Sequence, residues 1–139
     1  MLQGRHSCRS EWWGDWTVGE RDQYIQLDEL LPIIKERNPV LISHSEIGWK
    51  AMNHPSEKIH GDGGLRYRNA DIDCPGILAE GVHNPAGKKY RMVDGSHRIT
   101  KIKMETNRIE SYFYVLTNKE FYSHLKDYIY VEVIESKFF

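Results

Sequence analysis

The sequence has few cysteines and no long apolar run. Its 139 residues include two cysteines, Cys8 and Cys74, and these form no Cys-x-x-Cys pair. In a reducing compartment both are expected to be thiols, with a single bridge between them as the alternative. No apolar segment is long enough to span a bilayer, and the first residues lack the apolar core of a signal peptide. We therefore expect a cytoplasmic protein with no membrane partner.

The sequence also carries little net charge. The formal charge is −1, which gives no general attraction to nucleic acid. Basic residues are nevertheless concentrated between residues 86 and 110, where the sequence has seven of them and only three acidic residues. The basic residues are Lys88, Lys89, Arg91, Arg98, Lys101, Lys103 and Arg108. This excess is compatible with an anionic ligand or a polynucleotide, and equally with a solvated basic helix face.

No internal repeat or low-complexity tract is present, and 40% hydrophobic and 12% aromatic residues favour a folded chain. Helix and strand patterns are mixed without the regular alternation of a doubly wound sheet. We predict an α+β fold, with a small mixed β-sheet flanked by helices. An N-terminal arm at 1–22, held by its tryptophans, would pack on a single domain at 23–139.

Local patterns place the individual elements. Alternation and β-prone residues predict strands at 24–27, 40–42, 77–80, 89–93, 109–116 and 128–134. Helices are predicted at 29–37, with Asp28 as the N-cap, at 96–106, and after a Thr117–Glu120 capping box. A further helix is predicted from Ser43 or Ser45 to Met52. The stretch 53–69 contains the loop-forming segments Asn53-His54-Pro55-Ser56 and Gly61-Asp62-Gly63-Gly64, and is predicted to be a long loop.

The most informative motif is the turn Asp94-Gly95 between a predicted strand and a helix beginning at Ser96. Unpaired N–H groups and the positive end of the helix dipole attract anions there. The phosphate-binding candidates are Gly95, Ser96, His97 and Arg98, with Ser96 also the expected N-cap. For Arg98 the alternative is a surface salt bridge.

Asp94 and His97 are the candidate catalytic residues. Asp94 would be a base or a Mg²⁺ ligand, or alternatively a turn residue that caps the following N–H groups. His97 would be an acid, a base or a phosphate donor, or alternatively a packed side chain. Ser96 has no clear activating partner beyond His97, which argues against a covalent nucleophile.

The stretch Gly61–Arg68 is a candidate substrate loop, in which Arg66 and Arg68 would meet phosphate; a mobile surface loop is the alternative. Metal sites are not predicted. His54 and His60 are six residues apart, which does not match the zinc spacing of i and i+4. Asp71 and Asp73 could pair on a metal, but such residues are ordinary at the start of a strand.

The order of these motifs resembles the ParB/sulfiredoxin superfamily. A strand with Leu-Asp-Glu-Leu, a middle loop, Pro-Gly-Ile-Leu, a hairpin and Val-Asp-Gly-Ser-His-Arg-Ile carry the resemblance, which covers Gln23 to Thr117. In that superfamily the turn grips nucleotide phosphates. Ser96 stands where sulfiredoxins have their cysteine nucleophile, and Ser96-His97 replaces the Glu-Arg of partitioning proteins. Short relatives with an Asp-Gly turn include ParB-like nuclease domains and a free-serine kinase.

The resemblance implies a fold and a phosphate site, and three functions are compatible with it and with the basic residues. The first is binding of a nucleotide or other phosphate-bearing ligand, with phosphoryl transfer or phosphate-ester hydrolysis assisted by a nucleoside triphosphate and Mg²⁺. The second is a nucleic-acid-binding protein or ParB-like nuclease that contacts DNA through Lys88, Lys89, Arg91, Lys101 and Lys103. The third is a non-enzymatic interaction domain that keeps the fold.

Overall fold

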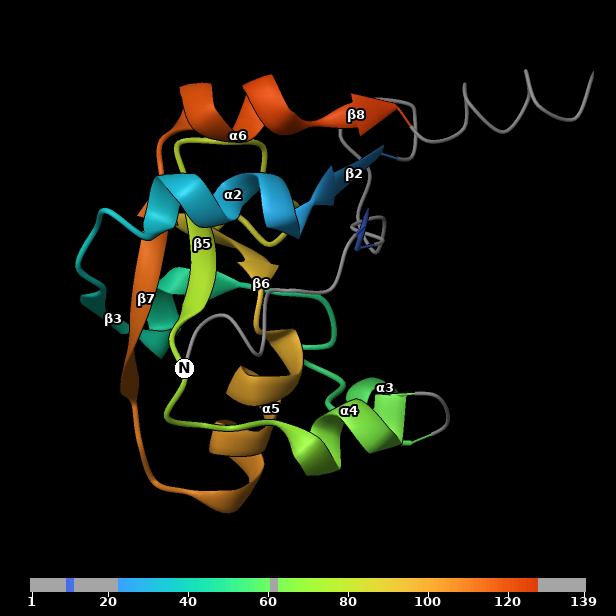
Figure 1. Cartoon of the computed structure of the whole chain (residues 1–139). Coiled ribbons are helices and arrows are strands. Elements are labelled where there is room, and N and C mark those ends of the chain that lie inside the picture. The colour runs from blue at the N-terminus through green and yellow to red at the C-terminus, as the bar shows by residue number, and fades with distance from the viewer. Residues whose placement is uncertain (1–9, 12–22, 61–62, 128–139) are drawn as a thin grey trace, which may run out of the picture.

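The chain has an α+β fold built around a five-stranded mixed sheet (Figure 1). The computed structural model describes residues 10–11, 23–60 and 63–127. Within these ranges the sheet has the strand order β3-β7-β5-β6-β4. Its strands are β3 (Val40–Ser43), β4 (Ile47–Gly48), β5 (Gly76–Glu80), β6 (Tyr90–Asp94) and β7 (Glu110–Leu116).

The strand pairing brings three chain segments together at one end of the sheet. β5 and β6 form the predicted antiparallel hairpin, and β7 runs parallel to β5. Ile77 lies opposite Asp94, and Gly76 lies opposite Phe113. The start of β5 therefore meets the end of β6 and the middle of β7. Helix α5 (Ser96–Glu105), as predicted, connects β6 to β7 and begins at this junction.

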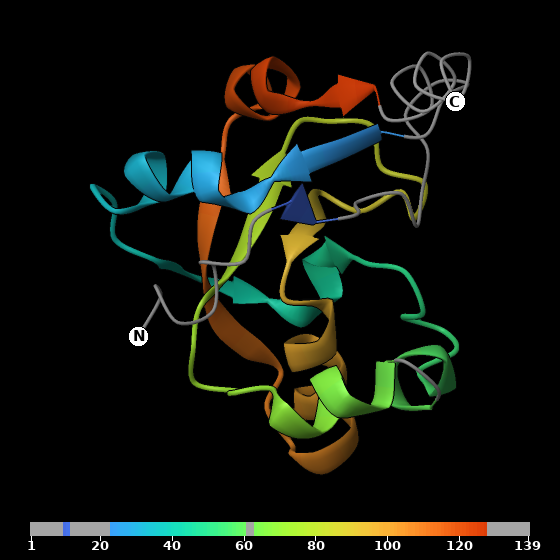
Figure 2. The ribbon, with the colours of Figure 1, turned by 45° about the vertical axis from the view of Figure 1, so that its right-hand side comes forward.

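The two faces of the sheet carry separate hydrophobic clusters, because successive strand residues point to opposite faces. Ile77 and Ala79 pack with α2 (Leu27–Ile34) and α6 (Asn118–His124), whose buried residues include Leu30 and Phe121. Leu78 packs on the other face with Ile99 of α5. Figures 1 and 2 show α2 and α6 in the upper part of the molecule and α5 in the lower part.

A second, three-stranded antiparallel sheet lies beside α2. It has the order β1-β2-β8, with β1 (Ser10–Glu11), β2 (Gln23–Gln26) and β8 (Lys126–Asp127). Lys126 Nζ donates to Gln26 Oε1 at 2.8 Å and to Glu29 Oε2 at 2.6 Å. The predicted strand at 128–134, and the tryptophans of the predicted arm, lie outside the described residues.

The boundaries of α2 differ from the prediction. The helix begins at Leu27 with Gln26 as its N-cap, so Asp28 is in the first turn and is not the cap. An acidic residue there still favours the helix, because its charge lies near the positive end of the dipole. The helix ends at Ile34, short of the predicted 37. Arg37 instead donates to the Val115 carbonyl and to Glu120.

Two predictions for the middle of the chain are wrong. Residues after Ser43 form a short 3₁₀ helix, η1 (His44–Glu46), and then β4, because Ile47 and Gly48 pair in parallel with β6. The expected loop at 53–69 contains helices α3 (Ser56–Ile59) and α4 (Gly63–Asn69). Both pack against α5. Such short helices depend on packing, which sequence patterns do not show.

Other predicted elements are confirmed. Strands 40–42 and 109–116 correspond to β3 and β7. In α6, the Thr117 side chain accepts from the Glu120 N–H at 3.2 Å, and the Glu120 carboxylate accepts from the Thr117 N–H at 2.9 Å. This is the predicted capping box. In the described part of the chain, no helix is both long and apolar enough to cross a membrane.

Candidate functional site between α5 and β7

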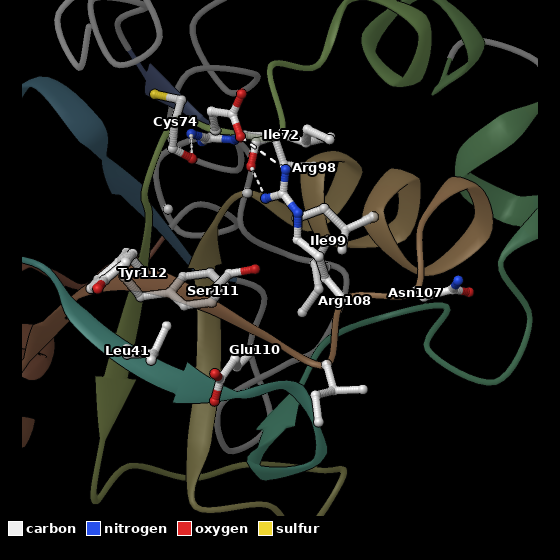
Figure 3. A pocket seen from close by; sticks show the side chains of 16 residues that line it. Leu41, Ile72, Cys74, Arg98, Ile99, Asn107, Arg108, Glu110, Ser111 and Tyr112 are labelled. Atoms are coloured by element: carbon white, nitrogen blue, oxygen red, sulfur yellow. Dashed lines mark hydrogen bonds and ion pairs between the residues drawn. The ribbon is translucent and has the colours of Figure 1, made fainter.

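A pocket of about 600 Å³ lies between α5, the segment that precedes β5, and the first half of β7 (Figure 3). It contains two of the residues predicted to bind phosphate, Gly95 and Arg98. Its other lining residues are partly apolar and partly polar: Leu41, Ile72, Asp73, Cys74, Gly76, Ile99, Ile102, Asn107, Arg108, Ile109, Glu110, Ser111, Tyr112 and Phe113. The pocket therefore adjoins Gly95, the second residue of the Asp-Gly turn.

Two glycines form the narrowest part of this junction. A Cβ on Gly76 would lie 2.6 Å from the Asp94 carbonyl oxygen, closer than real Cβ atoms approach. Gly95 has a φ of +118°, a conformation that side chains with a Cβ rarely adopt. It lies against Gly76 Cα, which would be 3.4 Å from a Cβ at Gly95. Both positions therefore require glycine for the turn to sit beside β5.

The N-terminus of α5 has no side-chain cap. Gly95 is the N-cap residue, so Ser96 is the first helical residue and not the cap that was predicted. The first helical hydrogen bond is donated by the Ile99 N–H to the Gly95 carbonyl at 3.0 Å. The N–H groups before it have no carbonyl one turn back in the helix. Together with the helix dipole they make this end attractive to an anion.

Arg98 is buried at the side of the pocket and holds three parts of the chain together. Its side chain is 10% exposed. Nη1 donates to the carbonyls of Cys74 and Pro75 at 3.2 and 3.1 Å, and Nη2 donates to Asp94 Oδ2 at 2.6 Å. These bonds use three of the five N–H groups of a guanidinium. Within the described part of the chain, these bonds do not use the N–H on Nε or one N–H on Nη2.

Asp94 is therefore an ion-pair partner. Its carboxylate accepts from Arg98 Nη2, a contact that the sequence did not predict. Asp73, the other pocket carboxylate near this end, accepts from Arg108 Nη2 at 2.9 Å. Among residues 23–60 and 63–127, no three His, Cys, Asp or Glu side chains converge on a possible metal position. The described residues therefore do not offer a set of ligands for a Mg²⁺ ion held by the protein.

Three of the five predicted basic side chains donate hydrogen bonds to carbonyl groups of the protein itself. Arg91 is 1% exposed and donates to the His83 carbonyl at 2.8 Å, so it does not belong to the surface. Its burial lowers its pKa to about 10. Lys101 Nζ donates to the Arg68 carbonyl at 2.8 Å, and Lys103 Nζ to the Met52 carbonyl at 3.0 Å. Lys88 and Lys89 are exposed in the hairpin loop.

The predicted substrate-loop arginines lie on α4. Arg66 and Arg68 are exposed, and neither lines the pocket. His97, in the first turn of α5, is half-buried and also does not line it. The structure thus gathers Gly95 and Arg98 in the pocket, with Asp94 bound to Arg98 at its edge. It leaves Ser96, His97, Arg66 and Arg68 outside the wall.

One pair of polar side chains at the pocket was not predicted. His44 Nε2 lies 2.7 Å from Ser111 Oγ, and Ser111 lines the pocket. The two residues are 67 positions apart in the sequence. No local motif marks either one, since the pair exists only because β3 lies beside β7. Only the strand pairing could have indicated it.

No protein-family model, no curated protein and no solved structure matches this chain.

Proposed function

We propose that this protein binds a nucleotide or a related phosphate-bearing ligand in the α5–β7 pocket, within a ParB/sulfiredoxin-like fold. The observation that carries the proposal is the uncapped N-terminus of α5, which opens on the pocket through Gly95. The phosphate would accept hydrogen bonds from backbone N–H groups of the first turn. The remaining N–H groups of Arg98 would add a charged donor.

The rest of the pocket supports a ligand with an apolar or aromatic body. Its volume of about 600 Å³ is typical of small-molecule sites. Ile99, Ile102 and Phe113 supply apolar wall next to the anion-binding end. A nucleotide has this division, with phosphate at one end and a flat base at the other.

The proposal concerns binding more than reaction. Asp94 is occupied by Arg98, so a metal ion at Asp94 would have to displace a buried guanidinium. We therefore derive no step through a Mg²⁺ ion held by the protein. His97 lies in the first turn of α5 and is the candidate that remains for proton transfer in phosphoryl transfer or phosphate hydrolysis.

A charge placed at Ser96 tests the binding site directly. Thermal unfolding would be followed with ATP, ADP, CTP, GTP and inorganic phosphate. Ser96→Asp should abolish stabilisation by these anions through repulsion, while its own effect on the helix should be neutral or favourable. The matched control is Ser56→Asp, which adds the same charge to the first turn of α3, outside the pocket.

The expected result is a rise in melting temperature for the unmodified protein and for Ser56→Asp, and no rise for Ser96→Asp. Absence of stabilisation by every anion, or equal stabilisation in all three proteins, would contradict the proposal. Steeply salt-dependent binding of DNA or RNA without any nucleotide effect would instead support the nucleic-acid alternative.

A further inference from the structure

The hydroxyl of Ser111 lies between the pocket and the His44 ring. Ser111 belongs to the pocket wall, whereas His44 does not. Along β7, Ser111 has the same parity as Phe113, and therefore points to the face of the sheet that α5 covers. His44 Nε2 contacts Ser111 Oγ at 2.7 Å. A molecule in the pocket would thus meet the hydroxyl first, with the imidazole behind it.

The position of His44 is set by the pairing of β3 with β7. Ile42 lies opposite Ser111 in this antiparallel ladder. The His44 N–H donates to the Ile109 carbonyl at 2.8 Å, which holds the residue at the end of β3. The imidazole therefore approaches Ser111 from a fixed backbone, as general-base geometry requires.

The surroundings of His44 favour the neutral imidazole. Burial lowers the pKa of His44, and the positive charge of Arg108 lowers it further, while Glu110 and the backbone of Arg108 have smaller effects that raise it. In the neutral tautomer that carries its proton on Nδ1, Nε2 is free to accept the Ser111 proton.

We propose that Ser111 and His44 form a nucleophile and general-base pair that hydrolyses carboxylic esters bound in the α5–β7 pocket. The pair has the first two parts of other activated serines, a hydroxyl and a base within hydrogen-bond distance of it. The backbone hydrogen bond from His44 to Ile109 fixes the position of the base. This activity goes beyond the proposed phosphate binding and does not require it.

The reaction proceeds in two balanced steps. Ser111 Oγ attacks the carbonyl carbon while its proton passes to His44 Nε2. The ester C–O bond then breaks, and the alcohol leaves with the proton from His44. In the second step a water molecule attacks the acyl-serine and gives a proton to His44. The bond to Oγ breaks, Ser111 recovers that proton, and the carboxylic acid is released.

The pocket wall indicates the kind of acyl group. Leu41, Ile99, Ile109 and Phe113 line the pocket with Ser111. These side chains suit a short aliphatic or aromatic acyl group, which would lie against carbon and leave the carbonyl facing the hydroxyl.

A covalent serine probe tests the pair without knowledge of the natural substrate. The full chain would be incubated with a small alkyl fluorophosphonate, and the adduct would be located by intact and peptide mass spectrometry. Hydrolysis of 4-nitrophenyl acetate and butyrate would be measured in parallel. We expect one adduct, on Ser111, that forms faster as His44 loses its proton, with a midpoint below pH 6.5.

The variants give the expected contrast. Ser111→Ala should lose the adduct, and His44→Gln should label about 100-fold more slowly. The matched control is Ser123→Ala: Ser123 Oγ lies 3.3 Å from His124 Nδ1 on α6, away from the pocket. That variant should label at the normal rate. Circular dichroism and thermal unfolding would show whether each variant is folded.

Two results would overturn the inference: no labelling of Ser111 in the folded protein, or labelling that His44→Gln leaves unchanged. Ser96→Asp separates this proposal from phosphate binding. If that variant loses anion stabilisation but still labels at Ser111, both proposals hold. If the unmodified protein labels but binds no anion, only the proposed phosphate binding fails.

Discussion

Burial decides which partners the side chains of Arg91 and Arg98 have. The sequence places Arg91 and Arg98 in the same positive stretch, where both suggest an anion partner. In the structure the partners are internal: the His83 carbonyl for Arg91, and Asp94 with two carbonyls for Arg98. A buried charge without such partners is unfavourable, so these contacts come first. Only the N–H groups that these internal contacts do not use are available to a ligand.

Gly76 provides a test at the scale of one residue. Gly76→Ala should lower the free energy of unfolding by about 3 kcal/mol, because the new methyl group would meet backbone and the Phe113 ring. Urea unfolding measures this. The control is Gly87→Ala, where nothing lies within 4 Å and only the positive φ opposes the change, at about 1 kcal/mol. Equal losses at the two positions would show that crowding at Gly76 is unimportant.

Helices in this protein differ in how far their own sequence determines them. α6 has a complete capping box, so its start at Asn118 was predictable from Thr117 and Glu120. α3 has no side-chain cap and is only four residues long. It forms beside α4 and α5, where packing supplies what its sequence lacks. The start of a capped helix can thus be predicted from the local sequence, whereas a short helix without a side-chain cap cannot.

The capping box of α6 can be tested by a pair of substitutions. Thr117→Ala removes the acceptor for the Glu120 N–H and should lower the free energy of unfolding by about 1 kcal/mol. Thr117→Ser keeps the hydroxyl and should lose much less. Thermal unfolding and helix content by circular dichroism provide the measurement. A similar loss in both variants would mean that the methyl group of Thr117, and not its hydroxyl, stabilises the helix.

At the scale of the whole molecule, the connection from α4 to β5 is held by cations of other elements. Lys101 donates to the Ala70 carbonyl, Arg108 to that of Ile72, and Arg98 to that of Cys74. This segment forms one side of the pocket. These basic residues, which the sequence suggested as part of a ligand-binding surface, therefore fix the position of one side of the pocket.

Arg98 should dominate this attachment. Arg98→Met removes the guanidinium that pairs with Asp94, at a site where the Arg98 side chain is 10% and the Asp94 side chain 20% exposed. We expect the free energy of unfolding to fall by about 3 kcal/mol. Arg108→Met is the matched control, because Arg108 is 42% exposed and its partner Asp73 is 78% exposed. Loss of this exposed ion pair should lower the free energy of unfolding by less than about 1 kcal/mol. Hydrogen exchange at 72–76 should rise mainly in Arg98→Met; equal exchange in both variants would contradict this order.

The sequence by itself determined the α+β class, the β5–β6 hairpin, α5, β7 and the cap of α6. Each of these depends on neighbours in the chain: alternation, a glycine turn, or a capping pair. Tertiary structure decided the rest. Ile47 and Gly48 became a strand because β6 lies beside them, and His44 met Ser111 because β3 lies beside β7. Contacts between distant segments leave no mark in local sequence. The turn at Gly95 could therefore be predicted from the sequence, whereas the pocket beside it could not.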